Sequence, residues 1–325
     1  MPSGEPSGLT YERLHLRGPA GAWRPLLGLF GVVALFFIGQ QVVVMVLALV
    51  RAGQGDSSAE ITRIFRGDPA TPTFLAAVNL GWAVAIPIVL LVAFVLHRMS
   101  PGWVVSVVGR LRWGWLLGCL GLATVALALT VMVSTLLPDQ GAGSVELTGD
   151  LNPWTSTVRD FVFVVVLLTP LQAAGEEFVF RGYLAQVFGG MFARVGAATG
   201  ATVAVLVPAL LFALAHGLGQ DLPIFFDRFA FGVVAGVLVL LTGGLEAGIA
   251  MHVLNNFLAF GIALAFSDMT SALNPTGGTW WSLPVTLTQS LAYLALVLWW
   301  ARRRGVATSV ATQDVAVLAA RQGPV

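Results

Sequence analysis

The sequence predicts an all-α protein, a polytopic bundle that crosses a membrane about eight times. Of its 325 residues, 57% are hydrophobic and 10% are charged, whereas a soluble domain carries about 25% charged residues. The hydrophobic residues gather in eight segments, each long enough for the helix of about 20 residues that crosses the hydrocarbon core. The net charge is only +1, which gives no reason to expect a nucleic-acid partner. The first expected partner is therefore the membrane.

The predicted spans cover residues 25–50, 74–97, 114–137, 161–184, 198–216, 225–242, 246–266 and 283–301. The sixth is the weakest, because Asp227 and Arg228 lie near its start. The first is too long for the hydrophobic region of a signal peptide, and it lacks a suitably placed small-residue cleavage site. It is expected to stay as the first transmembrane helix.

The distribution of arginine predicts the orientation. All 17 basic residues are arginine, a bias that suggests a bacterial plasma membrane. An even number of spans puts both termini on one side, and that side carries eleven arginines against five on the other: Arg13, Arg17, Arg24, Arg98, Arg110, Arg112, Arg194, Arg302, Arg303, Arg304 and Arg321. Because cytoplasmic loops are enriched in Lys and Arg, both termini are expected in the cytoplasm. The segment 98–113 is expected to lie at the membrane interface, with Arg112 at headgroup level.

Two adjacent acids and an arginine interrupt the fourth span. Ionisable residues inside a membrane cost about 2.5–3.5 kcal/mol each on insertion scales and usually mark function or a paired site. Glu177 and Arg181 are four residues apart on one helical face, so they are expected to form an ion pair. Glu176 lies about 140° around the helix from Arg181 and should point elsewhere. Glu177 therefore has an obvious structural partner, whereas Glu176 has none and needs another explanation.

Two later spans carry polar side chains at helical spacing. Phe212 and His216 are four residues apart, as are His252 and Asn256, so each pair shares a face. Taken singly, His216 could be an interfacial histidine, and His252 with Asn256 an interhelical hydrogen-bonded pair. Together with Glu176 they could converge on one pocket. If spans four, five and seven are simple crossings, His216 falls at the wrong end of span five, so convergence needs a tilted or displaced fifth span.

In this order, Glu176-Glu177-x-x-x-Arg181, Phe212-x-x-x-His216 and His252-x-x-x-Asn256 resemble the motifs of a known family. This is the CAAX protease and bacteriocin-processing (CPBP, or Abi) family, which includes the type II CAAX prenyl endopeptidases. The resemblance covers about 160–262. It implies an intramembrane endopeptidase that hydrolyses a peptide bond of a membrane-associated protein or peptide.

The resemblance also implies roles for individual residues. Glu176 would activate a water molecule, and Glu177 with Arg181 would hold the site. The carbonyl oxygen of the substrate would be polarised by His216, His252 and Asn256, and the pocket would include Phe180 and Phe212. Hydropathy and composition predict the rest of the organisation around the family-like catalytic core (155–266): a cytoplasmic N-terminal segment (1–24), an N-terminal transmembrane region of about three spans (25–150), a last span (267–304) and a disordered tail (305–325).

The residues leave two questions open. Glu176, His216 and His252 match the ligand set of some catalytic zinc sites, but no His-Glu-x-x-His motif is present. A metal-free glutamate site is favoured over one with a divalent metal such as zinc. The alternative function is a non-proteolytic immunity or scaffold protein, or a small-solute transporter that uses the same pocket. No inverted repeat of the kind that supports a transporter is found.

Overall fold

The computed structural model describes residues 8–19, 21, 23–138, 150–217, 219–275 and 277–311. In chain order its elements are η1 (Tyr11–Arg17), α1 (Trp23–Gly53), α2 (Ser58–Arg66), α3 (Pro72–Ala83), α4 (Ala85–Val95), α5 (Gly102–Val105), α6 (Trp113–Ser134), α7 (Ser156–Glu177), η2 (Phe178–Leu184), α8 (Ala185–Phe192), α9 (Ala197–Ala215), α10 (Leu222–Thr242), α11 (Glu246–Phe266), α12 (Met269–Leu273) and α13 (Ser282–Arg304). Within this part of the chain, eight segments are long and apolar enough to cross a membrane, including the weakly predicted sixth. The all-α polytopic bundle is confirmed.

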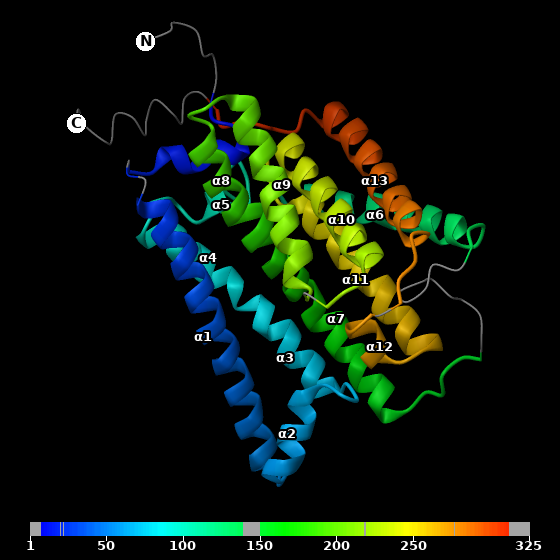
Figure 1. Ribbon diagram of the computed structural model, residues 1–325. Helices are drawn as coiled ribbons and strands as arrows, with labels where there is room; N and C mark the ends of the chain where they lie inside the picture. The colour runs from blue at the N-terminus through cyan, green and yellow to red at the C-terminus, as the bar shows by residue number, and fades with distance from the viewer. Residues whose placement is uncertain are drawn as a thin grey trace, which may run out of the picture.

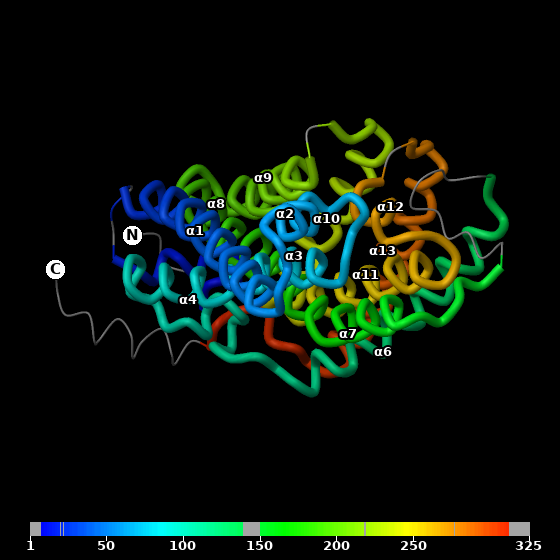
Figure 2. Tube along the Cα trace, turned by 90° about the horizontal axis from the view of Figure 1, so that it is seen from below, coloured from blue at the N-terminus to red at the C-terminus, as the bar shows by residue number. Residues whose placement is uncertain are grey.

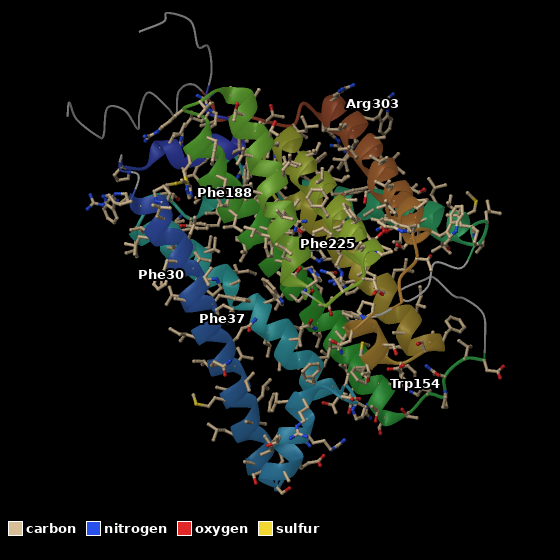
Figure 3. The ribbon with its side chains drawn as sticks, in the orientation of Figure 1. Phe30, Phe37, Trp154, Phe188, Phe225 and Arg303 are labelled. Carbon is tan, nitrogen blue, oxygen red and sulfur yellow. The ribbon has the colours of Figure 1, made fainter. Side chains whose placement is uncertain are left out.

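The outward faces of the helices are apolar, as contact with lipid requires. Phe30 and Phe37 project from α1 away from the other helices (Figure 3), and 71% and 59% of their surfaces are exposed. Exposed side chains of this size over a whole helix would make a soluble protein aggregate, whereas lipid tails solvate them. The chain is an integral membrane protein.

The two ends of the described chain meet at one end of the bundle, and α2 lies at the other (Figure 1). The amide of Val310 donates a hydrogen bond to the carbonyl oxygen of Leu9 at 3.0 Å, and Thr10 pairs with Ser309 in an isolated bridge. Parts of the expected segments lie outside the described residues, chiefly 1–7, 20 and 22 of the N-terminal segment, 139–149 of the N-terminal transmembrane region, and 312–325 of the tail.

The fourth membrane helix is longer than the sequence predicted. It runs without a break through α7, η2 and α8, from Ser156 to Phe192, and not from 161 to 184. At about 1.5 Å per residue it exceeds the hydrocarbon core of about 30 Å. Glu176 therefore lies near its middle and not near its end. The next helix, α9, needs almost its full length to return to that level.

The position of His216 follows from the packing of α9 along the fourth membrane helix. Near its start, a Cβ on Gly200 would come within 2.9 Å of the carbonyl oxygen of Gly189 in α8. Near its end, the ring of Phe212 meets the ring of Phe180 edge-on at 5.3 Å. The two helices are thus antiparallel neighbours, and the end of α9 reaches the level of Glu176. The displaced fifth span that convergence required follows from the extra turns of α8.

Behind this pair, α11 lies between α10 and α6 (Figure 2), and it also packs along α7. On the other side of α7, α3 comes close at Gly175, where a Cβ would lie 2.1 Å from the carbonyl oxygen of Trp82. A small residue at this position permits the contact, as is usual where membrane helices approach closely. The helices α3, α9, α10 and α11 thus surround the middle of the fourth membrane helix.

Arg112, which the sequence predicts at the membrane interface, has a buried partner that the sequence did not indicate. Its guanidinium binds the fully buried carboxylate of Glu246 through two bonds, Nε to Oε1 at 2.8 Å and Nη2 to Oε2 at 2.7 Å. A third contact runs from Nη1 to the carbonyl oxygen of Thr242 at 3.0 Å. This bidentate pair joins the start of α6 to the turn between α10 and α11.

The described N-terminal residues pack over α8 and bring His15 against His97, which follows α4. The rings of His15 and His97 stack with their centroids 4.3 Å apart, and Nε2 of His97 lies 2.8 Å from the hydroxyl oxygen of Tyr183. Burial and, to a smaller extent, the charge of Arg24 together lower the pKa of His97 to about 4. Burial also holds the pKa of His15 well below its ordinary value, with His97 adding to the effect.

This histidine pair predicts loss of stability in mild acid. An unfolded histidine binds a proton below about pH 6.5, whereas folded His97 resists protonation down to a pH of about 4. The free energy of unfolding should therefore be unaffected above about pH 6.5 and should fall as the pH is lowered from there towards 4. Melting temperatures in detergent across this range should fall less steeply for His97→Gln than for the wild type. If the melting temperatures of the wild type and His97→Gln fell equally steeply with pH, His97 would not be the cause of the acid sensitivity.

Candidate active site

Four charged or titratable side chains meet in the middle of the bundle, and all are buried. Glu176 and Glu177 end α7, Arg181 lies one turn on in η2, and His252 faces them from α11. Their exposed fractions are 3%, 0%, 1% and 4%. Buried charges are tolerated where they are paired and hydrogen-bonded, so the contacts among these groups decide what the site can do.

His252 lies between the two glutamates. Its Nδ1 is 2.9 Å from Oε1 of Glu177, a hydrogen-bond distance, and its Nε2 is 3.6 Å from Oε2 of Glu176, which is beyond one. An ionised carboxylate can only accept hydrogen bonds, so Nδ1 of His252 carries the hydrogen and donates a hydrogen bond to Glu177. That bond fixes the ring and aims Nε2 at Glu176. From the angle between them on the helix, Glu176 and Glu177 were expected to point in different directions, but both carboxylates face His252.

The predicted ion pair between Glu177 and Arg181 forms. Nη1 of Arg181 donates to Oε1 of Glu177 at 3.0 Å. Nε and Nη2 have no hydrogen-bond partner among the described residues. The guanidinium instead lies over the ring of Phe212, with Cζ 4.2 Å from the ring centroid. A cation over an aromatic face gains about 2 kcal/mol or more when it is desolvated, so Phe212 stabilises Arg181 as well as filling space.

Glu176 has a partner that the sequence analysis missed. Gln172, one turn earlier in α7, donates from Nε2 to Oε1 of Glu176, and its own Oε1 accepts from Nδ2 of Asn256 at 2.9 Å. Gln172 thus links the candidate base to the asparagine of the third motif. Its position four residues before Glu176 was a signal that helical spacing could have revealed. The other carboxylate oxygen, Oε2, has no hydrogen-bond partner in the described structure.

His216 is near this cluster but outside its hydrogen bonds. It follows the last residue of α9, and its Nδ1 lies 2.8 Å from the carbonyl oxygen of Phe212. The ring of Phe212 is edge-on to both His216 and His252, at centroid distances of 4.6 and 5.9 Å. In contrast to the buried His252, His216 is exposed. The structure therefore brings together Glu176, Glu177, Arg181, His252 and Asn256, with His216 beside their aromatic wall.

The three candidate ligands, Glu176, His216 and His252, do not fit a metal ion in the positions that they have in the structure. Within the described ranges, no group of three or more His, Cys, Asp or Glu side chains is arranged to hold one. Of the three candidate ligands, Glu176 and His252 face each other, but His216 is turned to the Phe212 carbonyl.

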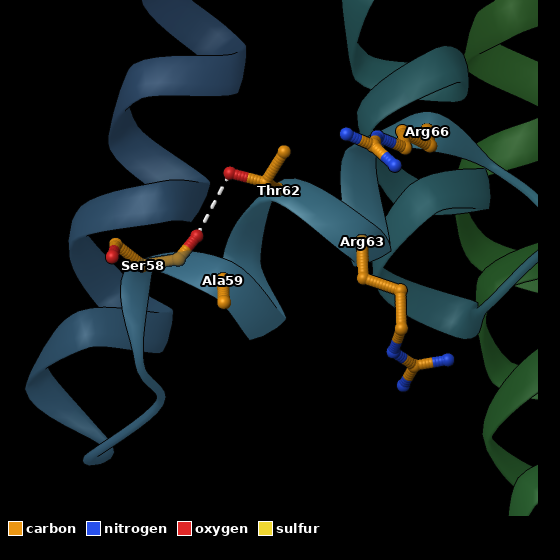
Figure 4. Close-up of a pocket in the computed structure, with 5 residues that line it drawn as sticks. All are labelled: Ser58, Ala59, Thr62, Arg63 and Arg66. Atoms are coloured by element: carbon orange, nitrogen blue, oxygen red, sulfur yellow. Dashed lines mark hydrogen bonds between the residues drawn. The ribbon is translucent and has the colours of Figure 1, made fainter.

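The hollow over α2, at the far end of the molecule, does not compete with this site. One of about 370 Å³ is lined by Ser58, Ala59, Thr62, Arg63 and Arg66 of α2 (Figure 4). Its walls carry no histidine or carboxylate, and the guanidinium of Arg63 is already paired with Glu60 at 2.6 Å. This surface lacks the paired acids and bases that mark a catalytic pocket.

Comparison with known families agrees with the motifs. Residues 158–258 match the family model described as Type II CAAX prenyl endopeptidase Rce1-like. The match takes in all the residues of the cluster, and it confirms the resemblance inferred from the three motifs. Searches of curated proteins and of solved structures give no significant match. At the level of the family, the match supports a CAAX-type intramembrane protease.

Proposed function

Since residues 158–258 match a family of membrane proteases, we propose that this chain is an intramembrane endopeptidase. Its substrate is a membrane-associated protein or peptide, in which it hydrolyses a peptide bond. One observation carries the proposal: the buried carboxylate of Glu176 has one oxygen held by Gln172, while the other is unbonded and faces Nε2 of His252 at 3.6 Å. A buried carboxylate inside a membrane protein is costly, so one that keeps an oxygen free of hydrogen bonds is expected to have a function.

Glu176 acts as the general base. A water molecule that donates to its Oε2 loses a proton to the carboxylate as its oxygen attacks the carbonyl carbon of the substrate. Gln172 keeps the carboxylate in place, so the free oxygen stays on the side of α11. The proton taken up by Glu176 is then available to the nitrogen of the leaving amine, and the base is regenerated.

His252 stabilises the oxyanion. Glu176 and Glu177 bring two negative charges and Arg181 one positive charge, so one further proton makes the buried cluster neutral. When that proton is on Nε2 of His252, the imidazolium donates to Glu177 through Nδ1 and to the developing oxyanion through Nε2. Glu177 orients this ring through the 2.9 Å bond and offsets its charge. Asn256 has a second N–H group beside the one that binds Gln172, and we assign it as a further donor to the carbonyl oxygen. His216 donates from Nδ1 to the carbonyl oxygen of Phe212, so we assign it to the wall of the pocket.

The alternative, a solute transporter or a non-proteolytic scaffold, predicts no chemical change in a peptide. The test uses the purified protein in phospholipid vesicles with membrane-anchored peptides, and the products are analysed by mass spectrometry. Cleavage at a defined bond supports the endopeptidase. Flux of a small solute with every peptide intact would instead support the transporter.

Gly248 provides a test of the geometry around Glu177. A Cβ at this position would lie 2.8 Å from Oε2 of Glu177, closer than side-chain carbons approach. Gly248→Ala should displace the carboxylate and, with it, His252. A misplacement of about 1 Å can cost about 100-fold in rate, so kcat should fall by at least tenfold on this scale. The matched control is Gly261→Ala on the same helix, where a Cβ meets nothing within 4 Å. Equal kcat values for the two variants would contradict this geometry.

A metal-free site predicts that cleavage survives removal of metal. Purified protein dialysed against a strong chelator should keep its kcat, and elemental analysis should give well under one zinc per chain. The three candidate ligands come from three separate helices and do not converge as a set. One zinc per chain, lost together with activity in His252→Ala, would overturn the metal-free assignment and leave the residue list standing.

A further inference from the structure

The last membrane helix, α13, ends in three consecutive arginines. Arg302, Arg303 and Arg304 are all exposed, and Figure 3 shows Arg303 at the end of the bundle where the two ends of the described chain meet. Among the described residues, none of the three is paired with an acid; the ion pairs use other arginines. The negative end of a helix attracts cations, but three guanidinium groups in a row still lack a counterion.

Two of these arginines are held against tryptophan rings. Cζ of Arg303 lies 4.4 Å from the ring centroid of Trp299, and Cζ of Arg304 lies 5.2 Å from that of Trp300. Each arginine follows its tryptophan by four residues and so shares its face of α13. A cation–π contact uses none of the N–H groups in a hydrogen bond. Each guanidinium is therefore placed while its donors stay available to a ligand.

The tryptophans are fixed in turn by packing against α6. The rings of Trp300 and Trp115 stack with their centroids 4.6 Å apart and an angle of 16° between their planes. Gly118 makes room for this contact, because a Cβ there would lie 1.9 Å from Cη2 of Trp300. The start of α6 therefore lies beside the end of α13, and the arginines belong to a surface made by two packed helices.

A lipid-facing surface begins directly beside the arginines. Trp113 and Leu117, one turn apart at the start of α6, are 67% and 65% exposed, and Trp299 on α13 is 50% exposed. Tryptophan is enriched where a membrane meets water, which puts the arginines at the level of the lipid headgroups. A phosphate ion in solution would contact the arginines alone. A phospholipid would contact the arginines with its phosphate and the exposed apolar side chains with its acyl chains.

From this arrangement we propose that the end of α13 and the start of α6 bind an anionic phospholipid of the adjoining leaflet. Arg303 and Arg304 hold its phosphate, since guanidinium groups bind phosphate oxygens through paired hydrogen bonds. The acyl chains lie against Trp299, Trp113 and Leu117. The anionic headgroup supplies the counterion that the described chain does not. This site is separate from the catalytic cluster, and the inference does not depend on cleavage of a peptide.

The first measurement compares two lipids on the full-length protein. The vesicles are of neutral phosphatidylcholine with a small fraction of anionic phosphatidylglycerol, and one lipid or the other carries bromine on its acyl chains to quench tryptophan fluorescence. At equal mole fraction the brominated anionic lipid should quench more strongly. Trp113→Phe combined with Trp299→Phe should remove this difference. Trp280→Phe combined with Trp281→Phe, which changes two exposed tryptophans next to the start of α13, should keep it.

Arginine variants test the cause of the preference. An arginine near an anionic surface contributes about fivefold in affinity, so Arg303→Gln with Arg304→Gln should lower the relative affinity for phosphatidylglycerol by about 25-fold. Lysine at both positions should keep part of the preference, because lysine keeps the charge but not the paired bonds. The matched control is Arg63→Gln with Arg66→Gln, which removes two exposed arginines of α2 at the opposite end of the bundle (Figure 1) and should keep all of it.

The outcomes that would overturn the proposal are distinct. One is equal quenching of the wild type by the two brominated lipids, and another is a glutamine variant of Arg303 and Arg304 that melts like the wild type and keeps the full preference. If the glutamine variant does not fold, the tryptophan variants decide, since a quenching difference that survives the loss of Trp113 and Trp299 places the lipid elsewhere. If inorganic phosphate abolishes the preference at constant ionic strength, the ligand is a free ion and the proposal is also overturned.

Discussion

Arg181→Ala is expected to lower the melting temperature in detergent more than any other single change in the cluster. The guanidinium is 1% exposed and is paired with a fully buried carboxylate. Removing one partner of a buried pair leaves an uncompensated charge, at a cost of about 3–5 kcal/mol. The contact of Arg181 with the ring of Phe212 is lost as well. Thermal unfolding followed by tryptophan fluorescence measures the effect.

Glu177→Gln completes a double-mutant cycle with Arg181→Ala. In the Arg181→Ala background it removes the unpaired charge, so the double variant should recover part of the lost stability. Arg63→Ala is the matched control, since Arg63 pairs with Glu60 on the exposed surface of α2, where ion pairs contribute little. An Arg181→Ala protein that melts like Arg63→Ala would show that the buried pair does not hold the site.

Glu176→Gln is expected to abolish cleavage with little change in melting temperature. The amide matches the carboxylate in shape and can keep the bond from Gln172, but it cannot take a proton from water. General-base catalysis contributes about 100- to 10,000-fold, so kcat should fall by at least that factor. Asp160→Asn is the matched control, because Asp160 is an exposed acid on the same helix. Wild-type kcat in Glu176→Gln would remove Glu176 from the role of base.

Much of the fold and the core of the site could be predicted from local pattern. Hydropathy gave the eight spans, because each must bury its backbone in lipid as a helix. Helical spacing gave the Glu177–Arg181 pair, because residues four apart are neighbours on any helix. The three motifs pointed to one pocket, since each polar group inside the membrane needs a partner.

What could not be predicted depends on contacts between distant residues. Gly189 lies inside α8 and allows close packing, with a Cβ there only 2.5 Å from the carbonyl oxygen of Glu12. A glycine in an apolar run is equally compatible with a loop, so the sequence placed the end of the fourth helix at 184 instead of Phe192. The π-helical turn of η2, a form often found at functional sites, has no sequence signal. The partner of Arg112 could not be predicted, because Glu246 is 134 residues away in the sequence.

The most direct test of the account is to follow the oxygen atom of water into the product. Purified protein in vesicles is incubated with a membrane-anchored peptide in water enriched in oxygen-18, and the fragments are weighed by mass spectrometry. A glutamate-activated water should leave one heavy oxygen in the new C-terminal carboxylate of the wild-type product, and Glu176→Gln should give no product. An intact peptide in the wild-type reaction, or labelled product at the same rate from Glu176→Gln, would contradict the account.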